Sequence, residues 1–340
     1  MYIWNCMKPK NTLREHLTIE QRLNLFCKGA PFILRNVVKR LMFRFGNITT
    51  QSGTYHSQAT LEESVAYIRQ VFSDYKHYGG IERFYGKVAE VGTGDSCGVG
   101  ILFLSDGCEQ VDLIDKYYST RHKQHQHNII KALIESSAGV IRMTPYNGLI
   151  GEEHIEGLSR FYGSQASSEQ FFTDHRKYDF IVSRAVFEHV DHPEQSLIRM
   201  IDALNPHGML LHKVDLRDHG LFTPQRHELT FLQVPQWYYR LMTHGSGKPN
   251  RVLMHRYQHI LEQSGLDYTF FVTRLVGVGD IIPHKPWEGI DKTLRDKSLH
   301  IIKKMKPSFA KEFQLCDERF LAISGFFMIA KTVKRNEHKQ

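Results

Sequence analysis

The feature that most restricts the fold is an alternation of short apolar runs with helical segments, which starts at Gly86. A further apolar strand is expected somewhere in residues 139–163, and the clearest helix covers residues 194–204. Strands that alternate with helices are typical of β-α-β units, so the pattern predicts a parallel sheet covered by helices. The four clearest strands are predicted at residues 87–91, 110–115, 179–183 and 209–214.

Two later apolar runs, at residues 268–272 and 320–330, are expected to pair as an antiparallel ribbon that closes the sheet. The segments at about 216–258 and 274–319 do not continue the alternation and are interpreted as inserted caps. The predicted fold class is therefore α/β: a Rossmann-like, seven-stranded, mostly parallel sheet with an antiparallel closing strand. An N-terminal helical extension precedes it.

The charge of the chain separates its flanks from its body. Residues 1–80 carry 11 Lys or Arg against 5 Asp or Glu, residues 292–340 carry 12 against 5, and the middle is mildly acidic. We therefore predict a basic extension over 1–80 and a main domain over 81–335. The acidic body argues against a nucleic-acid groove across the main domain, whereas the flanks could contact phosphate or anionic lipid.

Residues 30–45 have the periodicity of an amphipathic helix, with an apolar stripe on one face and basic residues over the rest of the circumference. Two interpretations stay open: the helix packs its stripe on the main domain, or it lies on an anionic membrane surface. The stripe consists of Leu34, Val37, Val38, Leu41 and Phe45.

Cysteine usage and the absence of long apolar runs indicate the cellular environment. The five cysteines are scattered and form no C-x-x-C pair, which argues against a disulfide framework and a zinc ribbon. No metal is expected at His122, His125 and His127, since no partner ligands follow at zinc spacing. We expect a cytoplasmic protein, at the inner membrane face if the helix binds lipid.

The stretch VAEVGTGDS, residues 88–96, is the most informative motif. A buried strand leads through Glu90 into Gly92 and Gly94, whose missing side chains let a ligand approach the backbone. Asp95 or Ser96 can cap the helix that follows. The next strand ends at Asp115, where a carboxylate can accept hydrogen bonds from both hydroxyls of an adenosine ribose.

Two cofactors compete for this geometry. A dinucleotide turn requires G-x-G-x-x-G, but the third glycine position holds Cys97, and Glu90 would place negative charge beside the phosphates. S-adenosylmethionine instead has a positive sulfur and a positive amino group. Glu90 therefore favours S-adenosylmethionine over NAD.

The run EVGTGDS, with Asp115 and the later segment YDFIVSRAVFEHVDHPEQSLIRMIDALNPHG, resembles class I S-adenosylmethionine-dependent methyltransferases over roughly residues 80–275. The segments LHKVDLRDHG and PNRVLMHRYQHILEQSGL resemble a bacterial subgroup whose substrates are mostly unassigned and whose members often occur among cell-surface glycan enzymes. One departure is Ser96, where many members have a third glycine.

The resemblance implies a role for each matching residue. Glu90, Gly92 and Gly94 would line the methionine portion of the cofactor, and Asp115 would bind the ribose. Thr93 and Ser96 of the same turn are also expected to contact the cofactor. The turn at Ser183, Arg184 and Ala185 would pass beside the reactive methyl group.

Methyl transfer needs alignment of acceptor, methyl and sulfur, and a hydroxyl acceptor also benefits from a general base. The base candidates are His189, after the fourth strand, and Asp215 and His219, after the fifth, all at the edge of the sheet where α/β ligands bind. The alternative for each is a purely structural role, and Asp215 could simply pair with Arg217.

Three functions remain open from the sequence. The first is methyl transfer to an oxygen of a small molecule or glycan precursor. The second is RNA methylation with the basic flanks as a phosphate grip, which is disfavoured because SRAV at residues 183–186 differs from the N-P-P-Y type motif that holds a nucleobase amino group. The third is a non-catalytic module that keeps only the cofactor fold.

Overall fold

The computed structural model describes residues 54–136, 143–144, 154–174, 176–223 and 227–332, with a few residues between 27 and 50. Its centre is an eight-stranded sheet with the order β11-β10-β12-β9-β8-β2-β3-β7. The five strands from β9 to β7 are parallel to one another, and β12, β10 and β11 pair antiparallel. The strands are β2 (Gly86–Val91), β3 (Cys108–Asp115), β7 (Leu158–Tyr162), β8 (Tyr178–Arg184), β9 (Leu204–Asp215), β10 (Asp267–Leu275), β11 (Gly279–Lys285) and β12 (Ile323–Lys331).

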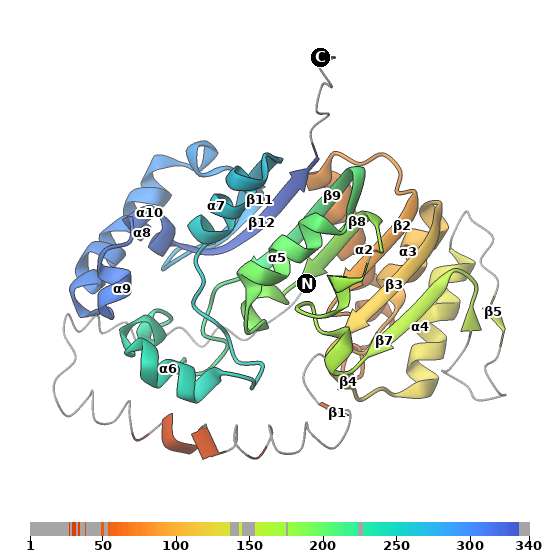
Figure 1. The fold of residues 1–340 in the computed structure, drawn as a ribbon, viewed down its shortest axis with the longest axis horizontal. Helices are drawn as coiled ribbons and strands as arrows, with labels where there is room; N and C mark the ends of the chain where they lie inside the picture. The colour runs from red at the N-terminus through yellow and green to blue at the C-terminus, as the bar shows by residue number, and fades with distance from the viewer. Residues whose placement is uncertain are drawn as a thin grey trace.

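Helices cover both faces of the sheet (Figure 1). The side chains of α2, α3 and α4 form one hydrophobic core with one face, and those of α5, α7 and α8 form a second core with the other. Burial of both faces explains why the central strands appear in the sequence as continuous apolar runs. The helices are α2 (Leu61–Gly79), α3 (Gly98–Asp106), α4 (Lys123–Glu135), α5 (Pro193–Asp202), α6 (Gln236–Thr243), α7 (Met254–Ser264), α8 (Lys292–Met305), α9 (Lys311–Gln314) and α10 (Glu318–Ala322).

The predicted fold class is confirmed, and the sheet has one strand more than expected. The additional strand is β11, which lies within the segment 274–319 that the sequence indicates as a cap. Its pairing with β10 places it at the edge of the sheet, where Pro283 is tolerated because one side of the strand needs no partner. The uncertain strand expected in 139–163 is β7. Two short two-stranded sheets lie outside the main one: β1 (Thr49–Thr50) with β4 (Tyr118–Ser119), and β5 (Met143–Thr144) with β6 (His154–Ile155).

Helix α2 lies inside the predicted extension 1–80, yet it packs on the sheet and belongs to the core. Its start has a full capping box: Thr60 accepts from the backbone of Glu63, and the Glu63 carboxylate accepts from the backbone of Thr60. Ile68 and Tyr75 are buried against the main domain. The boundary at residue 80 stays a proposal.

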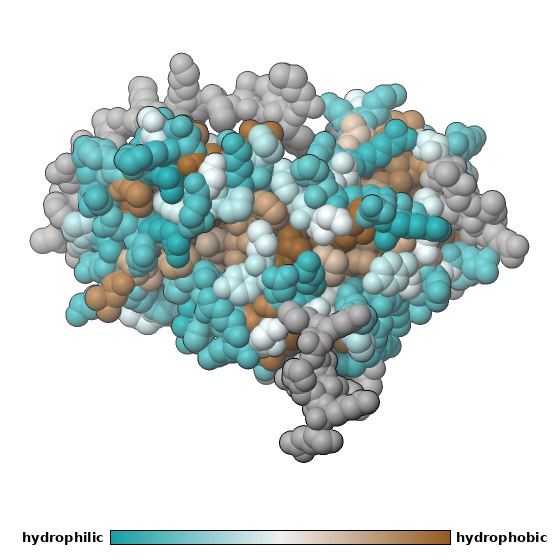
Figure 2. All heavy atoms as spheres, turned by 90° about the horizontal axis from the view of Figure 1, so that it is seen from above, coloured by the Kyte–Doolittle hydropathy of each residue, from teal (hydrophilic) through white to brown (hydrophobic). Residues whose placement is uncertain are grey.

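The predicted helix over 30–45 lies largely outside the described residues. Among those described, Leu34 and Val38 are helical and exposed, whereas Gly29 is buried against Tyr238 and Met242 of α6. None of the described helices is both long and apolar enough to cross a membrane. Hydrophobic side chains gather in a band across the middle of the face in Figure 2, and hydrophilic side chains cover most of both ends.

Candidate functional site

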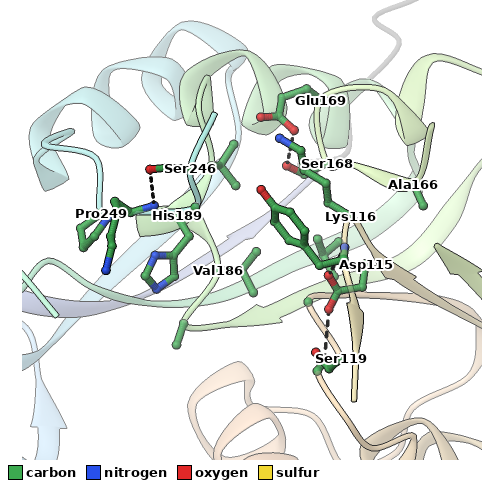
Figure 3. A pocket seen from close by; sticks show the side chains of 18 of the residues that line it. Asp115, Lys116, Ser119, Ala166, Ser168, Glu169, Val186, His189, Ser246 and Pro249 are labelled. Carbon is green, nitrogen blue, oxygen red and sulfur yellow. Dashed lines mark hydrogen bonds between the residues drawn. The ribbon is translucent and has the colours of Figure 1, made fainter. Parts of the chain in front are cut away.

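A cavity of about 370 Å³ opens at the carboxyl ends of β2, β3 and β8. This is the edge of a parallel sheet at which α/β folds bind ligands. Figure 3 shows Asp115, Lys116, Ser168 and Glu169 on one side, and His189 with the 246–249 loop on the other. The lining comprises Val91, Gly92, Gly94, Asp115, Lys116, Tyr117, Ser119, Ala166, Ser168, Glu169, Ala185, Val186, His189, Val190, His219, Ser246, Gly247, Lys248 and Pro249.

The floor of the cavity is the turn after β2. Gly92 and Gly94 both have positive φ, +77° and +61°, which glycine adopts without strain. A Cβ atom on Gly92 would lie 2.1 Å from Cγ2 of Val186, so a side chain there would collide with the turn after β8. The sequence prediction that these glycines bring bare backbone to a ligand site agrees with this geometry.

Asp115 connects the ends of β2 and β3. Its carboxylate accepts hydrogen bonds from the backbone N–H of Gly94 at 3.2 Å and of Tyr117 at 2.9 Å. Burial raises the pKa of Asp115, while these two backbone bonds oppose the rise. The side chain lines the cavity, as its proposed ribose contact requires.

Asp95 and Ser96, which follow the glycines, have hydrogen-bond partners within the protein. The hydroxyl of Ser96 accepts a hydrogen bond from the backbone N–H of Gly98, the first residue of α3, at 3.2 Å; the N-cap position itself is Cys97. Asp95 instead accepts from Ser57 at 2.7 Å, through both its backbone N–H and its hydroxyl. Thr93 and Ser96 do not belong to the cavity lining. Their cofactor contacts remain predictions.

Glu90 lies on β2, two residues before Gly92, and is 8% exposed; it does not belong to the cavity lining. Its Oε2 atom is buried without a hydrogen-bond partner among the described residues, and burial raises the pKa of Glu90 to about 8. A buried carboxyl group with an unsatisfied oxygen fits a cationic ligand, because a neighbouring positive charge would stabilise the ionised form. The amino group of S-adenosylmethionine supplies such a charge. Glu90, the glycine turn and Asp115 together therefore fit the predicted cofactor.

Ser183 and Arg184 lie away from this cavity. Ser183 is fully buried, and its hydroxyl bonds Nδ1 of His212 at 2.8 Å. Arg184 forms an ion pair with Asp74 on α2 at 2.7 Å and lines a second cavity. Of the predicted turn, Ala185 lines the first cavity, and its φ of +55° is rare for a residue with a side chain.

His189 and His219 meet at the far side of the cavity from Asp115. Their ring centroids are 4.7 Å apart, and the planes are inclined by 68°. Burial, and then the neighbouring His219, lower the pKa of His189 to about 4, so His189 is neutral at pH 7. His219 also has a positive φ, +47°. Three described non-glycine residues have a positive φ, and two of them, Ala185 and His219, line this cavity. Such strained backbone is often found at functional sites.

The third base candidate, Asp215, is engaged by Arg217. The Arg217 Nε atom donates to both carboxylate oxygens of Asp215, at 2.8 and 3.0 Å. Burial acts to raise the pKa of Asp215, but the bonds and charge of Arg217 outweigh it and hold the pKa below its ordinary value. The expected pairing of Asp215 with Arg217 is thus present, and an ionised, paired carboxylate is a poor proton acceptor.

Two residues of the site, Glu188 and Asn250, have no role predicted from the sequence, although both lie in segments that resemble the methyltransferases. Glu188 is fully buried, its Oε1 lies 3.8 Å from Nε2 of His219, and burial with the charge of Asp215 raises its pKa well above the ordinary value. The loop 246–249 arrives from beyond α6 and is held by Asn250, whose amide donates to the carbonyls of Phe187 and Val190. The resemblance of these segments indicates the family, but it does not show that Glu188 and Asn250 meet at the cavity, because they are about 60 residues apart.

Three potential ligand atoms, one each from Glu188, His189 and His219, lie within 4.8 Å of one another. Among the described residues, this is the group whose ligand atoms lie close enough together to hold a metal ion. The sequence predicts no metal site. In the His122 cluster, Nδ1 of His122 instead caps α4 by accepting the backbone N–H of His125 at 3.2 Å.

The chain was compared with known structures, curated proteins and protein-family models. Haemonchus contortus phosphoethanolamine N-methyltransferase 2, solved with phosphomonomethylethanolamine and S-adenosylhomocysteine, is 12% identical (TM-score 0.40, 78% of this chain and 52% of that chain). The YcgJ protein from Bacillus subtilis is 10% identical (TM-score 0.37, 78% of this chain and 97% of that chain). No curated protein matches the sequence. The decisive match is to the methyltransferase domain family, over residues 85–269. Since that match covers more than half of the chain, the protein belongs to the S-adenosylmethionine-dependent methyltransferases of this family.

Proposed function

We propose that the protein transfers a methyl group from S-adenosylmethionine to a hydroxyl oxygen of a small molecule or glycan precursor. The observation that supports an oxygen acceptor is the histidine pair at the end of the cavity opposite Asp115. Transfer to a hydroxyl requires removal of a proton, and histidine is the usual group for that task near neutral pH. The bound cofactor supplies an activated methyl group on a positively charged sulfur.

His219 is the proposed general base. Its Nε2 lies 3.3 Å from the backbone carbonyl oxygen of Asp215, and a carbonyl oxygen can only accept a hydrogen bond. Nε2 therefore carries the proton in the neutral ring, which leaves Nδ1 to accept the proton of the acceptor hydroxyl. The Asp215 carboxylate, 3.8 Å from Nε2, would stabilise the imidazolium that forms.

His189 would orient His219 and keep water from the reacting oxygen. Its low pKa keeps the ring uncharged, so it does not repel the imidazolium that His219 becomes. The proposed cofactor contacts are Glu90 for the amino group, the backbone of Gly92 and Gly94 for the methionine portion, and Asp115 for the ribose.

The test uses ¹³C-methyl-labelled S-adenosylmethionine with fractionated extracts, followed by NMR of the labelled product. The carbon shift distinguishes methyl groups on oxygen, nitrogen and carbon. We expect an O-methyl signal, and His219→Ala should lower kcat by about 10² to 10⁴ while cofactor binding stays intact. His259→Ala, an exposed histidine on α7, is the matched control. A methyl group on nitrogen or carbon, or full activity of His219→Ala, contradicts the proposal.

A further inference from the structure

A second cavity, of about 270 Å³, lies beside the first and is not used by the cofactor contacts described above. It opens between the ends of β8, β9, β10 and β12 and is flanked by β11. Ala185 lines both cavities, so they meet at one small side chain. The basic side chains of its lining are Arg184, Lys213, Arg217, Arg274 and His284.

The cations of this cavity outnumber the carboxylates that face them. Arg184 and Lys213 are register partners on adjacent parallel strands, and both rely on one carboxylate, Asp74, at 2.7 and 3.5 Å. The other two cations have a carboxylate each: Arg217 pairs with Asp215, and Arg274 pairs with Asp280 at 2.7 Å. Within ion-pair distance, four cations therefore share three carboxylates; the charge of Glu228, outside the cavity lining, also acts on Arg217.

His284 is neutral and does not change the charge of the cavity. Its Nδ1 lies 2.7 Å from the carbonyl oxygen of Ile281 and must donate to it. Its Nε2 then accepts from Nζ of Lys213 at 2.9 Å, which requires a neutral ring. Tyr78 stacks on this ring at 4.7 Å and fixes its position.

The pKa of Lys213 is lowered in this cavity. Burial, and then the neighbouring Arg184, lower the pKa of Lys213 to about 8, although Asp74 and Asp280 oppose the change. The Nε atom of Arg274 is also buried without a hydrogen-bond partner among the described residues. A compact anion would supply both a compensating charge and a hydrogen-bond acceptor.

We propose that the second cavity binds an anionic group of the methyl acceptor, a carboxylate or a phosphate monoester. The inference rests on the proposed function, because it places the acceptor hydroxyl in the first cavity beside His219. An acceptor anchored by its anion beside Lys213 and Arg274 would extend past Ala185, the residue that lines both cavities. The substrate class is thus a small hydroxylated acid or a phosphorylated alcohol, such as a sugar acid or sugar phosphate.

The test measures the reactivity of Lys213 in the full chain, with inorganic phosphate and acetate as separate probes. Only the neutral amine reacts with acetic anhydride, and the extent of acetylation at each lysine is read by mass spectrometry. An anion that raises the pKa of Lys213 by about one unit would slow its acetylation at pH 8 roughly five-fold. Lys303, which is exposed on α8, should react at an unchanged rate.

Arg274→Gln removes one cation of the cavity at a partly exposed position. In this variant, we expect the anion concentration needed to protect Lys213 from acetylation to rise at least ten-fold. Arg69→Gln, at an exposed arginine of α2, should leave that concentration unchanged. Protection by phosphate alone identifies a phosphate monoester, and protection by acetate alone identifies a carboxylate. Lys213 reactivity that neither anion changes, or equal protection in Arg274→Gln, overturns the inference.

The outcome is independent of the proposed oxygen chemistry. If the enzyme O-methylates an uncharged alcohol and neither anion changes the acetylation rate of Lys213, the inference alone fails. If the labelled methyl group is found on nitrogen or carbon while phosphate protects Lys213, the proposed function alone fails.

Discussion

The carboxylate of Asp115 accepts the backbone N–H of Gly94, 21 residues earlier in the chain, at 3.2 Å. This bond holds the turn after β2 against the end of β3, and both residues line the cavity. The shape of the cofactor site therefore depends on a polar contact between two turns as well as on the apolar core beneath them.

Gly92→Ala should disturb this site more than a single methyl group suggests. The new Cβ would meet Val186 at 2.1 Å, and the left-handed backbone at this position costs a residue with a side chain about 1–2 kcal/mol. We expect a lower Tm and cofactor binding at least ten-fold weaker. Val186→Ala in the same chain removes the collision, so the double variant should recover part of both losses; no recovery would show that Val186 is not the obstacle.

Binding of S-adenosylmethionine should release a proton from Glu90. The pKa of Glu90 is raised to about 8 by burial, so the carboxyl is largely protonated at pH 7, and a cationic amino group beside it would favour ionisation. Calorimetry in buffers of different ionisation enthalpy should show release of nearly one proton per site in the wild type at pH 7. Glu90→Gln, which cannot ionise, should release none. Equal release by both proteins would place the amino group elsewhere.

His212 should make the fold sensitive to acid. Burial lowers its pKa to about 3, so between that value and the ordinary 6.5 the unfolded chain binds a proton that the folded chain does not. The stability from this histidine is present above pH 6.5 and is lost as the pH falls, on the order of 2 kcal/mol between pH 7 and pH 4.5. His212→Asn can keep a hydrogen bond to Ser183 but has no such titration. In urea unfolding, the difference in stability between wild type and variant should shrink across this range; parallel pH profiles would argue against a neutral, buried His212.

The strands that lie inside the sheet could be predicted from sequence, because burial on both faces leaves an uninterrupted apolar run. Strand β11 could not, since four of its residues are exposed, Pro283 among them, and this removes the signal at the edge of the sheet. The sequence places strand β7 only within a wide range, because Leu158 is its one buried residue and the other four are partly exposed.

The candidate site divides in the same way. The glycine turn and Asp115 follow strands within a continuous motif, and the structure places them together at the cavity. The sequence predicts Arg184 beside the cofactor. In the structure its side chain pairs with Asp74 on α2 and lines the second cavity instead. Lys213 and Asp74 are far apart in sequence, and only the packing of α2 on the sheet makes them neighbours.

Calorimetric titration of S-adenosylmethionine into the wild type and into Asp115→Asn tests the central claim most directly. Asparagine keeps the size of the side chain but removes one of its acceptor oxygens, so the ribose hydroxyls and the N–H of Gly94 would lose a partner. Glu109→Gln, an exposed residue at the other end of β3, is the matched control. We predict one binding site in the wild type, affinity reduced at least ten-fold in Asp115→Asn, and no change in Glu109→Gln. Equal affinity in Asp115→Asn and the wild type would contradict the assignment of this cavity to the methyl donor.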